Sequence, residues 1–266
     1  MCVSAFEAGF KETTILMHEP EPAKLGHHTR VMLYQNTTQN WHKGPNAMLL
    51  HLDSARPMSP GNFVETTKFP HLLEDMVDAV RPHTRDIDMG TFSMAKGAQV
   101  FDVGIYTVVL GHAADIPAAL NLVPQEKRPQ VNGPLFEFYA EAFPSFTIAL
   151  CCFSASAKSE PLMLWWEPQD PNVFRMPGLD EHTGGIPRFG DPVWVDHWLL
   201  ASSYRMKHGT TVEYTDNIPQ PVLNLLPYQV IGRHFSGMMP NGDFGFHAKD
   251  LRNGHMPEPM RLAPPA

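Results

Sequence analysis

Short apolar runs separated by turn residues occupy the first part of the chain. They cover residues 3–6, 13–18, 30–37 and 46–52, and glycines, prolines and polar residues bound them. Runs of this length and composition are typical of β-strands. Because they follow one another with no helical pattern between them, we expect them to form an antiparallel sheet.

The clearest helical pattern lies in residues 68–80. Apolar residues recur there at intervals of three and four, which is the pattern of one buried helix face. These residues are Phe69, Leu72, Leu73, Met76, Val77 and Val80. Pro82 predicts the end of this helix. Shorter patterns predict helices near 115–123, 133–143 and 221–226.

The remaining apolar runs predict further strands. The β-branched run at 100–110 is typical of one central strand. Further strands are expected at 146–153, 162–167, 192–200, 210–214 and 228–235. The segment rich in proline and glycine at 168–192 is expected to be a loop, and Asn241-Gly242 predicts a turn.

This order of elements predicts an α+β fold with a largely antiparallel sheet, because strands outnumber helices and are often consecutive. No flexible linker divides the sequence, so we expect a single domain over residues 1–266. The proline-containing residues 257–266 are expected to form a surface tail.

Charge and composition exclude several classes of partner. The net charge is −8 and the basic residues are scattered, which disfavours binding to nucleic acid. The most apolar run, 146–153, is far shorter than the roughly 20 residues of a membrane-spanning helix. We see no targeting segment and expect a soluble, cytoplasmic protein with no membrane partner. Cys151 and Cys152 lie in that apolar run and are expected to behave as small hydrophobic residues.

The residue that points most directly to a reaction is Cys2. Removal of Met1 would make it the first residue, with a thiol and a free α-amine on one residue. An α-amine has a pKa of about 7.7–8.0, so it can accept the proton of the thiol near neutral pH. The other interpretation of Cys2 is structural, as a small apolar residue that begins a strand.

Three further residues fit a cysteine nucleophile. Asn36 ends one predicted strand and Asn46 begins the next, so both are expected at one edge of the sheet. Their amides are candidate donors to an oxyanion. Arg30 is a candidate for orienting a substrate carboxylate or carbonyl group.

Met1-Cys2, followed at once by an apolar strand and then by more strands, resembles the cysteine branch of the N-terminal-nucleophile hydrolases. The resemblance implies two antiparallel sheets stacked between helical layers, an αββα arrangement. It also implies cleavage of an amide or related acyl compound by Cys2, with a small-molecule substrate and no cofactor. The glycine-rich segment that follows the cysteine in amidotransferase relatives is absent, since Val3-Ser4-Ala5 stands there.

Two alternatives remain open. Asp180, His182 and His197 have the ligand types of a zinc or iron site, which would indicate a metal-dependent enzyme. Asp196 and His197 are neighbours in a predicted strand and should face opposite sides, so they are not expected to bind one ion. A binding protein without enzymatic activity is the other alternative, with tryptophans lining a groove. These are Trp165, Trp166, Trp194 and Trp198.

Overall fold

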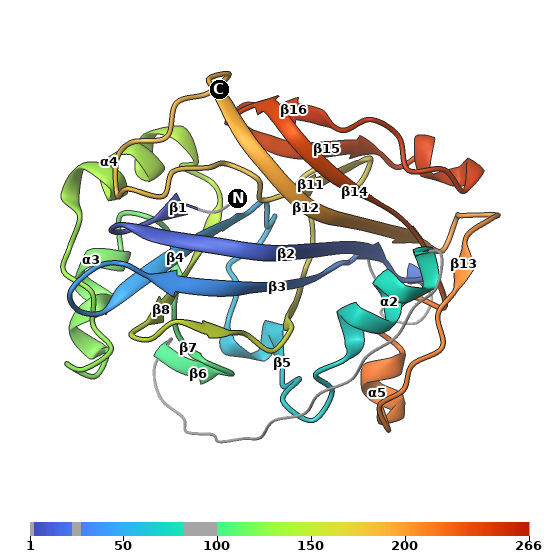
Figure 1. Cartoon of the computed structure of the whole chain (residues 1–266), viewed down its shortest axis with the longest axis horizontal. Coiled ribbons are helices and arrows are strands. Elements are labelled where there is room, and N and C mark those ends of the chain that lie inside the picture. Colours follow the sequence, from blue (N-terminus) through green and yellow to red (C-terminus); the bar gives the residue numbers. More distant parts are fainter. Residues whose placement is uncertain (1–2, 23–27, 82–99, 266) are drawn as a thin grey trace.

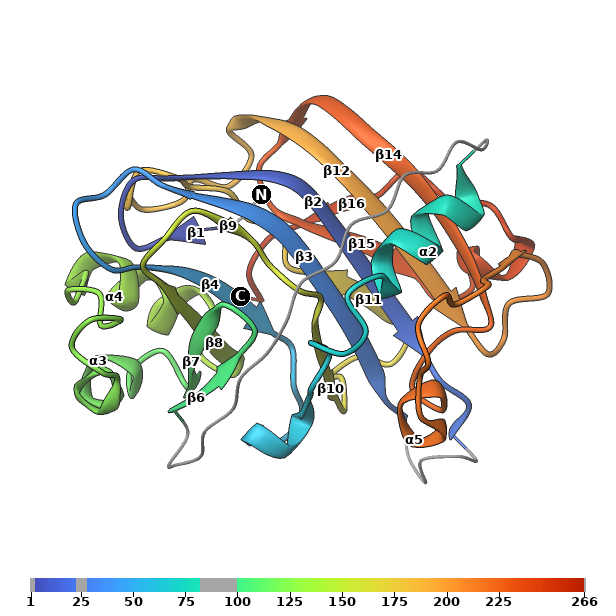
Figure 2. The same cartoon turned by 60° about the horizontal axis from the view of Figure 1, so that its bottom comes forward.

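Two β-sheets lie face to face, and helices cover the outer face of each sheet (Figures 1 and 2). The computed structural model describes residues 3–22, 28–81 and 100–265. The predicted α+β fold with largely antiparallel sheets is therefore confirmed, and its layers follow the order helix, sheet, sheet, helix.

The smaller of the two stacked sheets has five strands, all antiparallel to their neighbours. In spatial order they are β1 (Val3–Ser4), β4 (Asn46–Leu52), β8 (Thr147–Phe153), β7 (Tyr106–Gly111) and β6 (Val100–Val103). β1 thus places the beginning of the described chain at one edge of this sheet.

The larger sheet contains the two longest pairings of the fold, β2 with β3 and β12 with β14. In spatial order its strands are β13 (Thr210–Thr211), β14 (Gln229–Pro240), β12 (Pro192–Ser203), β2 (Ala8–Glu19), β3 (Arg30–Asn40), β10 (Leu162–Trp166) and β5 (Phe63–Val64), with β9 (Ala157–Lys158) beside β3. β12 and β2 run parallel, whereas the other described neighbours in this sheet are antiparallel.

A third sheet contributes aromatic side chains to the core between the stacked sheets. Its strands are β11 (Val173–Met176), β15 (Asp243–His247) and β16 (Met260–Leu262). Phe174, Phe244 and Phe246 from this sheet are buried in the central core. The hydrophobic effect therefore joins the third sheet to the sandwich.

The helices bury the outer faces of the stacked sheets. α3 (Ile116–Ala119) and α4 (Gly133–Ala142) share one core with the smaller sheet, and α2 (Leu72–Val80) and α5 (Gln220–Leu223) lie over the larger sheet. Short 3-10 turns complete the helical elements: η1 (Pro60–Asn62), η2 (Leu120–Leu122) and η3 (Asp250–Asn253).

This layering explains why the central strands are apolar without alternation. In β8, Cys151 faces the core between the sheets, whereas Cys152 faces the helices. A strand covered on both faces needs apolar residues at successive positions. Both thiols are buried, and burial raises the pKa of Cys152 to about 12, so both cysteines behave as the predicted small hydrophobic residues.

Several element predictions are confirmed and some are wrong. Residues 46–52 form β4, and the helices predicted at 68–80 and 133–143 are α2 and α4, although α2 begins only at Leu72. The run at 100–110 is not one central strand. Gly104 has a left-handed backbone (φ 54°) and divides it into the hairpin β6–β7, which lies at the sheet edge.

Two segments expected to lack regular structure contain strands. The loop at 168–192 includes β11, and the tail at 257–266 includes β16, and both pair with β15. Because β15 itself follows the Asn241-Gly242 turn, these strands depend on partners far away in the sequence.

A buried carboxyl group at the end of β4 gives the fold a pH dependence. Asp53 accepts a hydrogen bond from Trp166 Nε1 at 2.9 Å, and burial raises its pKa to about 7 against an ordinary value of 3.8. Its contribution to folding stability is therefore full below pH 3.8 and is lost as the pH rises through about 7. Ionisation of Asp53 destabilises the native state.

Asp53→Asn should therefore stabilise the protein at pH 8 and change its stability little at pH 4. Each pKa unit corresponds to about 1.4 kcal/mol, so we expect a gain of roughly 2–4 kcal/mol at the higher pH. Urea unfolding of both proteins at the two pH values measures it. Asp243→Asn is the contrasting control, because His51 and Arg175 beside Asp243 hold its pKa low, and this change should destabilise the protein at pH 8. Equal effects of Asp53→Asn at both pH values would contradict the assignment.

Candidate functional site

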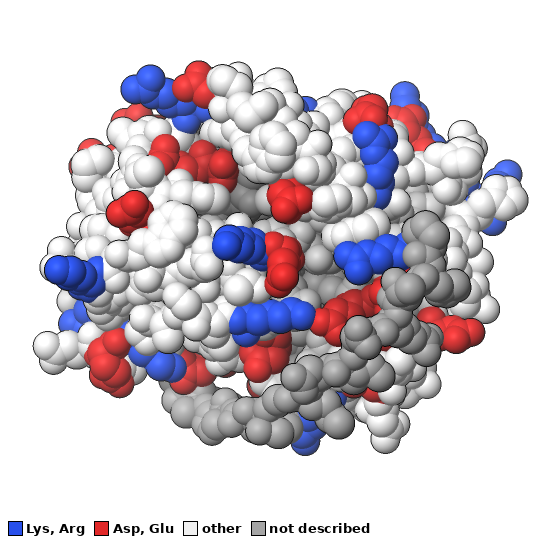
Figure 3. All heavy atoms as spheres, in the orientation of Figure 1, with Lys and Arg blue, Asp and Glu red and all other residues white. Residues whose placement is uncertain are grey.

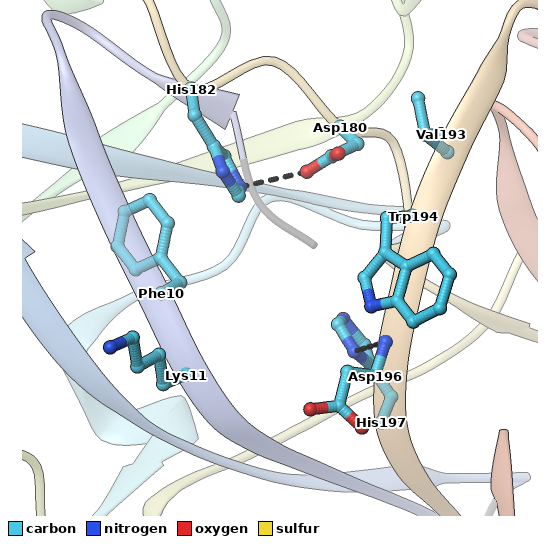
Figure 4. A pocket seen from close by; sticks show the side chains of 8 residues that line it. All are labelled: Phe10, Lys11, Asp180, His182, Val193, Trp194, Asp196 and His197. Atoms are coloured by element: carbon cyan, nitrogen blue, oxygen red, sulfur yellow. Dashed lines mark hydrogen bonds and ion pairs between the residues drawn. The ribbon is translucent and has the colours of Figure 1, made fainter. Parts of the chain in front are cut away.

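A pocket opens where β2 and β12 diverge. Their parallel pairing begins at Thr13 and His197, and before these residues each strand pairs only with its other neighbour, β3 or β14. The opening has a volume of about 360 Å³ (Figure 4). We call it the window, and define it by the residues that line it: Phe10, Lys11, Asp180, His182, Val193, Trp194, Asp196 and His197.

An irregularity in β2 lies at the point where the strands separate. The pairing of β2 with β3 shifts register between Lys11 and Thr14, and Glu12 has a left-handed backbone with φ 55°. A β-bulge bends its strand and increases the local twist. Thr37 donates a hydrogen bond to Glu12 Oε2 at 2.9 Å across this irregularity. The bulge thus explains why β2 leaves β12 beyond Thr13.

Residues 180–182 cross from β2 to the end of β14 and form the third side of the window. On one side the N–H of Ala8 donates to the carbonyl oxygen of His182 at 2.9 Å. On the other side the N–H of Asp180 donates to Asn241 Oδ1 at 2.9 Å, and Asn241 Nδ2 donates to the carbonyl oxygen of Asp180 at 2.8 Å. This segment, residues 180–182, is therefore held at both ends.

The segment carries a histidine paired with a carboxylate. His182 Nε2 lies 2.8 Å from Asp180 Oδ1, and both side chains project into the window (Figure 4). The ring of Phe10 packs edge-on against the His182 ring, with centroids 5.2 Å apart. A histidine oriented in this way by a carboxylate has the arrangement of a general base.

His197 lies at the inner side of the window and is uncharged. Its Nδ1 accepts a hydrogen bond from the backbone N–H of Asp196 at 3.1 Å. The side chain is buried, and burial lowers its pKa well below the usual value of 6.5. Asp196 is exposed and lies 2.9 Å from His234, so neighbours Asp196 and His197 face opposite sides of β12, as expected.

The beginning of the described chain is bonded to the crossing segment. Val3 forms a parallel β-bridge with Glu181, and the N–H of Ser4 donates to the carbonyl oxygen of Glu181 at 2.9 Å. Further along, Asn132 Nδ2 links the same two segments of the chain, because it donates to the carbonyl oxygens of Ala5 and Gly184 at 2.9 and 2.8 Å. Cys2 itself lies outside the described residues.

The two predicted oxyanion donors lie elsewhere and are bonded within the protein. Asn36 is buried between the sheets, where Nδ2 donates to Tyr34 Oη at 3.1 Å and Oδ1 accepts from Tyr106 Oη at 2.9 Å. Asn46 holds the turn after β1, accepting from the N–H of Phe6 at 3.0 Å and donating to its carbonyl oxygen at 3.1 Å. Neither side chain lines the window.

Arg30 also lies away from the window, in a buried ion pair. Its Nη1 lies 3.3 Å from Glu19 Oε1, and Nη2 donates to the carbonyl oxygen of Pro171 at 2.6 Å. The guanidinium group lies 4.1 Å from the centre of the Phe174 ring. Arg30 is therefore buried in the interior of the fold and does not line the window.

The three residues of the metal alternative do share the window. Asp180, His182 and His197 all line it. Nevertheless, within the described residues no group of three or more histidine, cysteine, aspartate or glutamate side chains lies close enough to hold a metal ion.

Of the four tryptophans in the binding alternative, Trp194 alone lines the window. Trp166 is buried in the central core. The sequence did not predict that Phe10 and Lys11 line the window. The feature that places them there is the bulge at Glu12, which is recognisable only from the pairing of β2 with β3.

Comparison with known proteins does not show a family. No family model matches the chain, and no curated protein matches it. Among solved structures the chain is similar to the crystal structure of baculovirus P35, with a TM-score of 0.45 and 11% sequence identity. That alignment covers 94% of this chain and 92% of the other.

On the face shown in Figure 3, acidic and basic side chains are interspersed. No helix among the described residues is long and apolar enough to cross a membrane.

Proposed function

We propose that this protein hydrolyses small amides or transfers their acyl groups, with Cys2 as the nucleophile and the window as the substrate site. One observation carries the proposal: the β-bridge between Val3 and Glu181. Glu181 stands between Asp180 and His182, so the residue that follows Cys2 in the sequence is bridged to the segment that carries the paired histidine. The bridge therefore supports the proposal that the Cys2 thiol attacks a substrate bound beside His182.

The proposed reaction uses the thiol and the paired histidine. His182, oriented by Asp180, takes the thiol proton while the sulfur attacks the acyl carbon. The C–N bond then breaks, the amine departs with that proton, and a thioester remains on Cys2. Water, or a second acceptor, attacks the thioester and restores the thiol.

We assign His197 a structural role in the wall of the window. It is neutral, and its Nδ1 already accepts the hydrogen bond from the Asp196 N–H. We therefore assign it to holding the wall of the window, and assign the proton transfer to His182, which is partly exposed.

Backbone N–H groups are the proposed oxyanion donors, because the amides of Asn36 and Asn46 are already bonded to other groups. A reduced thiol is required at Cys2, which fits the expected cytoplasmic location. No cofactor is needed for this reaction.

Two preparations that differ at the N-terminus test the proposal and its base together. One begins with Cys2, and the other carries one glycine before Cys2, with intact mass confirming each. If His182 is the base, both should hydrolyse a panel of small amides at rates within about tenfold. Loss of turnover only in the extended protein would assign the base to the α-amine. No turnover of any amide by either preparation would count against the proposed function.

A further inference from the structure

One rim of the window carries an aromatic ring and a carboxylate that the proposed acyl chemistry does not use. Trp194 is 63% exposed, and the side chain of Asp196 is 58% exposed. They stand two residues apart on β12, so they share one face of the strand. In Figure 4 the Trp194 ring lies at β12, and the Asp196 carboxylate lies further along the same strand.

The environment of Trp194 is apolar but open. Met238 pairs with Trp194 in the β12–β14 register and is 60% exposed. Large exposed apolar groups that lie together at a pocket are typical of binding sites. The face of an indole ring attracts organic cations, and a carboxylate beside it adds a charge-assisted hydrogen bond.

We propose that the window selects acyl substrates with a cationic side chain, whose guanidinium or ammonium group stacks on Trp194 and pairs with Asp196. This inference rests on the proposed function and names its substrate class. Lys11 lines the opposite rim on β2 and repels a cation from that side. The cation is therefore directed to β12, and the acyl group lies toward His182.

The present partner of Asp196 does not prevent this binding. Asp196 Oδ1 lies 2.9 Å from His234 Nε2, and His234 is 43% exposed. The planar guanidinium of an arginine side chain can donate two parallel N–H bonds to one carboxylate, whereas His234 meets Asp196 through Nε2 alone. The substrate cation therefore forms the stronger interaction with the carboxylate.

Calorimetric binding to the full chain with Cys2→Ala tests the selection without turnover. The probes are N-acetyl-arginine amide, N-acetyl-citrulline amide, which has a similar shape without the charge, and N-acetyl-glutamate amide. We expect arginine to bind at least about tenfold more tightly than citrulline. Asp196→Asn and Trp194→Ala should each remove most of this preference, and Trp194→Phe should retain part of it.

Two exposed residues outside the window provide matched controls. Tyr228→Ala removes an aromatic ring that is 73% exposed, and Asp115→Asn removes an exposed carboxylate; neither should change binding. Thermal unfolding confirms that each variant is folded. Equal affinity for arginine and citrulline, or tighter binding of glutamate, would overturn the inference.

The inference and the proposed function fail separately. If wild-type protein cleaves amides with no preference for a cationic side chain, the substrate class is wrong and the acyl chemistry stands. If the Cys2→Ala protein binds the arginine probe but wild type cleaves none of its amides, the cation site stands and the acyl chemistry is wrong.

Discussion

Replacing Cys2 with alanine should lower amide turnover by roughly 10³-fold or more, because loss of the nucleophile removes the covalent step. Substrate binding should change little, since Cys2 is not among the residues that line the window, which are Phe10, Lys11, Asp180, His182, Val193, Trp194, Asp196 and His197. Steady-state kinetics on the best amide of the panel measure the first effect, and calorimetry measures the second.

Cys2→Ser is the informative companion to this variant. It keeps a hydroxyl nucleophile of similar size, so any residual activity should exceed that of Cys2→Ala. Cys151 and Cys152 are buried, so an alkylating reagent applied to the native protein should modify one thiol and abolish turnover. Full activity of the Cys2→Ala protein would reject the proposed nucleophile.

Replacing His182 with glutamine should lower turnover by about 10²–10⁴-fold, which is the usual contribution of a general base. Asp180→Asn should have a smaller effect in the same direction, because Asp180 orients His182 at 2.8 Å without receiving the proton.

A second histidine–carboxylate pair in the same chain provides the control. His71 Nδ1 lies 3.0 Å from Asp216 Oδ1, at the start of α2 and away from the window. His71→Gln breaks a pair of the same kind, and it should leave turnover unchanged. An equal loss from His71→Gln and His182→Gln would mean that stability, and not base catalysis, explains the effect.

The sequence predicted the parts of the fold that local pattern determines. The apolar run 46–52 and the turn residues before it predicted β4, and the spacing of Leu72, Met76 and Val77 predicted α2. Both elements bury surfaces that their own residues specify, so no distant partner was needed to recognise them.

The window depends on contacts that no local pattern encodes. It requires the bridge between Val3 and Glu181 and the two hydrogen bonds between Asp180 and Asn241. Asp180, His182 and His197 were predicted together as metal ligands, and all three line the same pocket. The prediction of Asn36 and Asn46 placed their amides near a nucleophile, whereas side-chain hydrogen bonds hold the Asn36 amide in the interior and the Asn46 amide at the turn after β1.

Trapping the acyl-enzyme tests the central claim most directly. The wild-type protein is mixed with an amide substrate, quenched in acid during turnover, digested and analysed by mass spectrometry. We predict the acyl group as a thioester on the peptide that contains Cys2, with none on that peptide in the Cys2→Ala protein. Turnover with no acyl group on Cys2, or with the acyl group on another residue, would contradict the account.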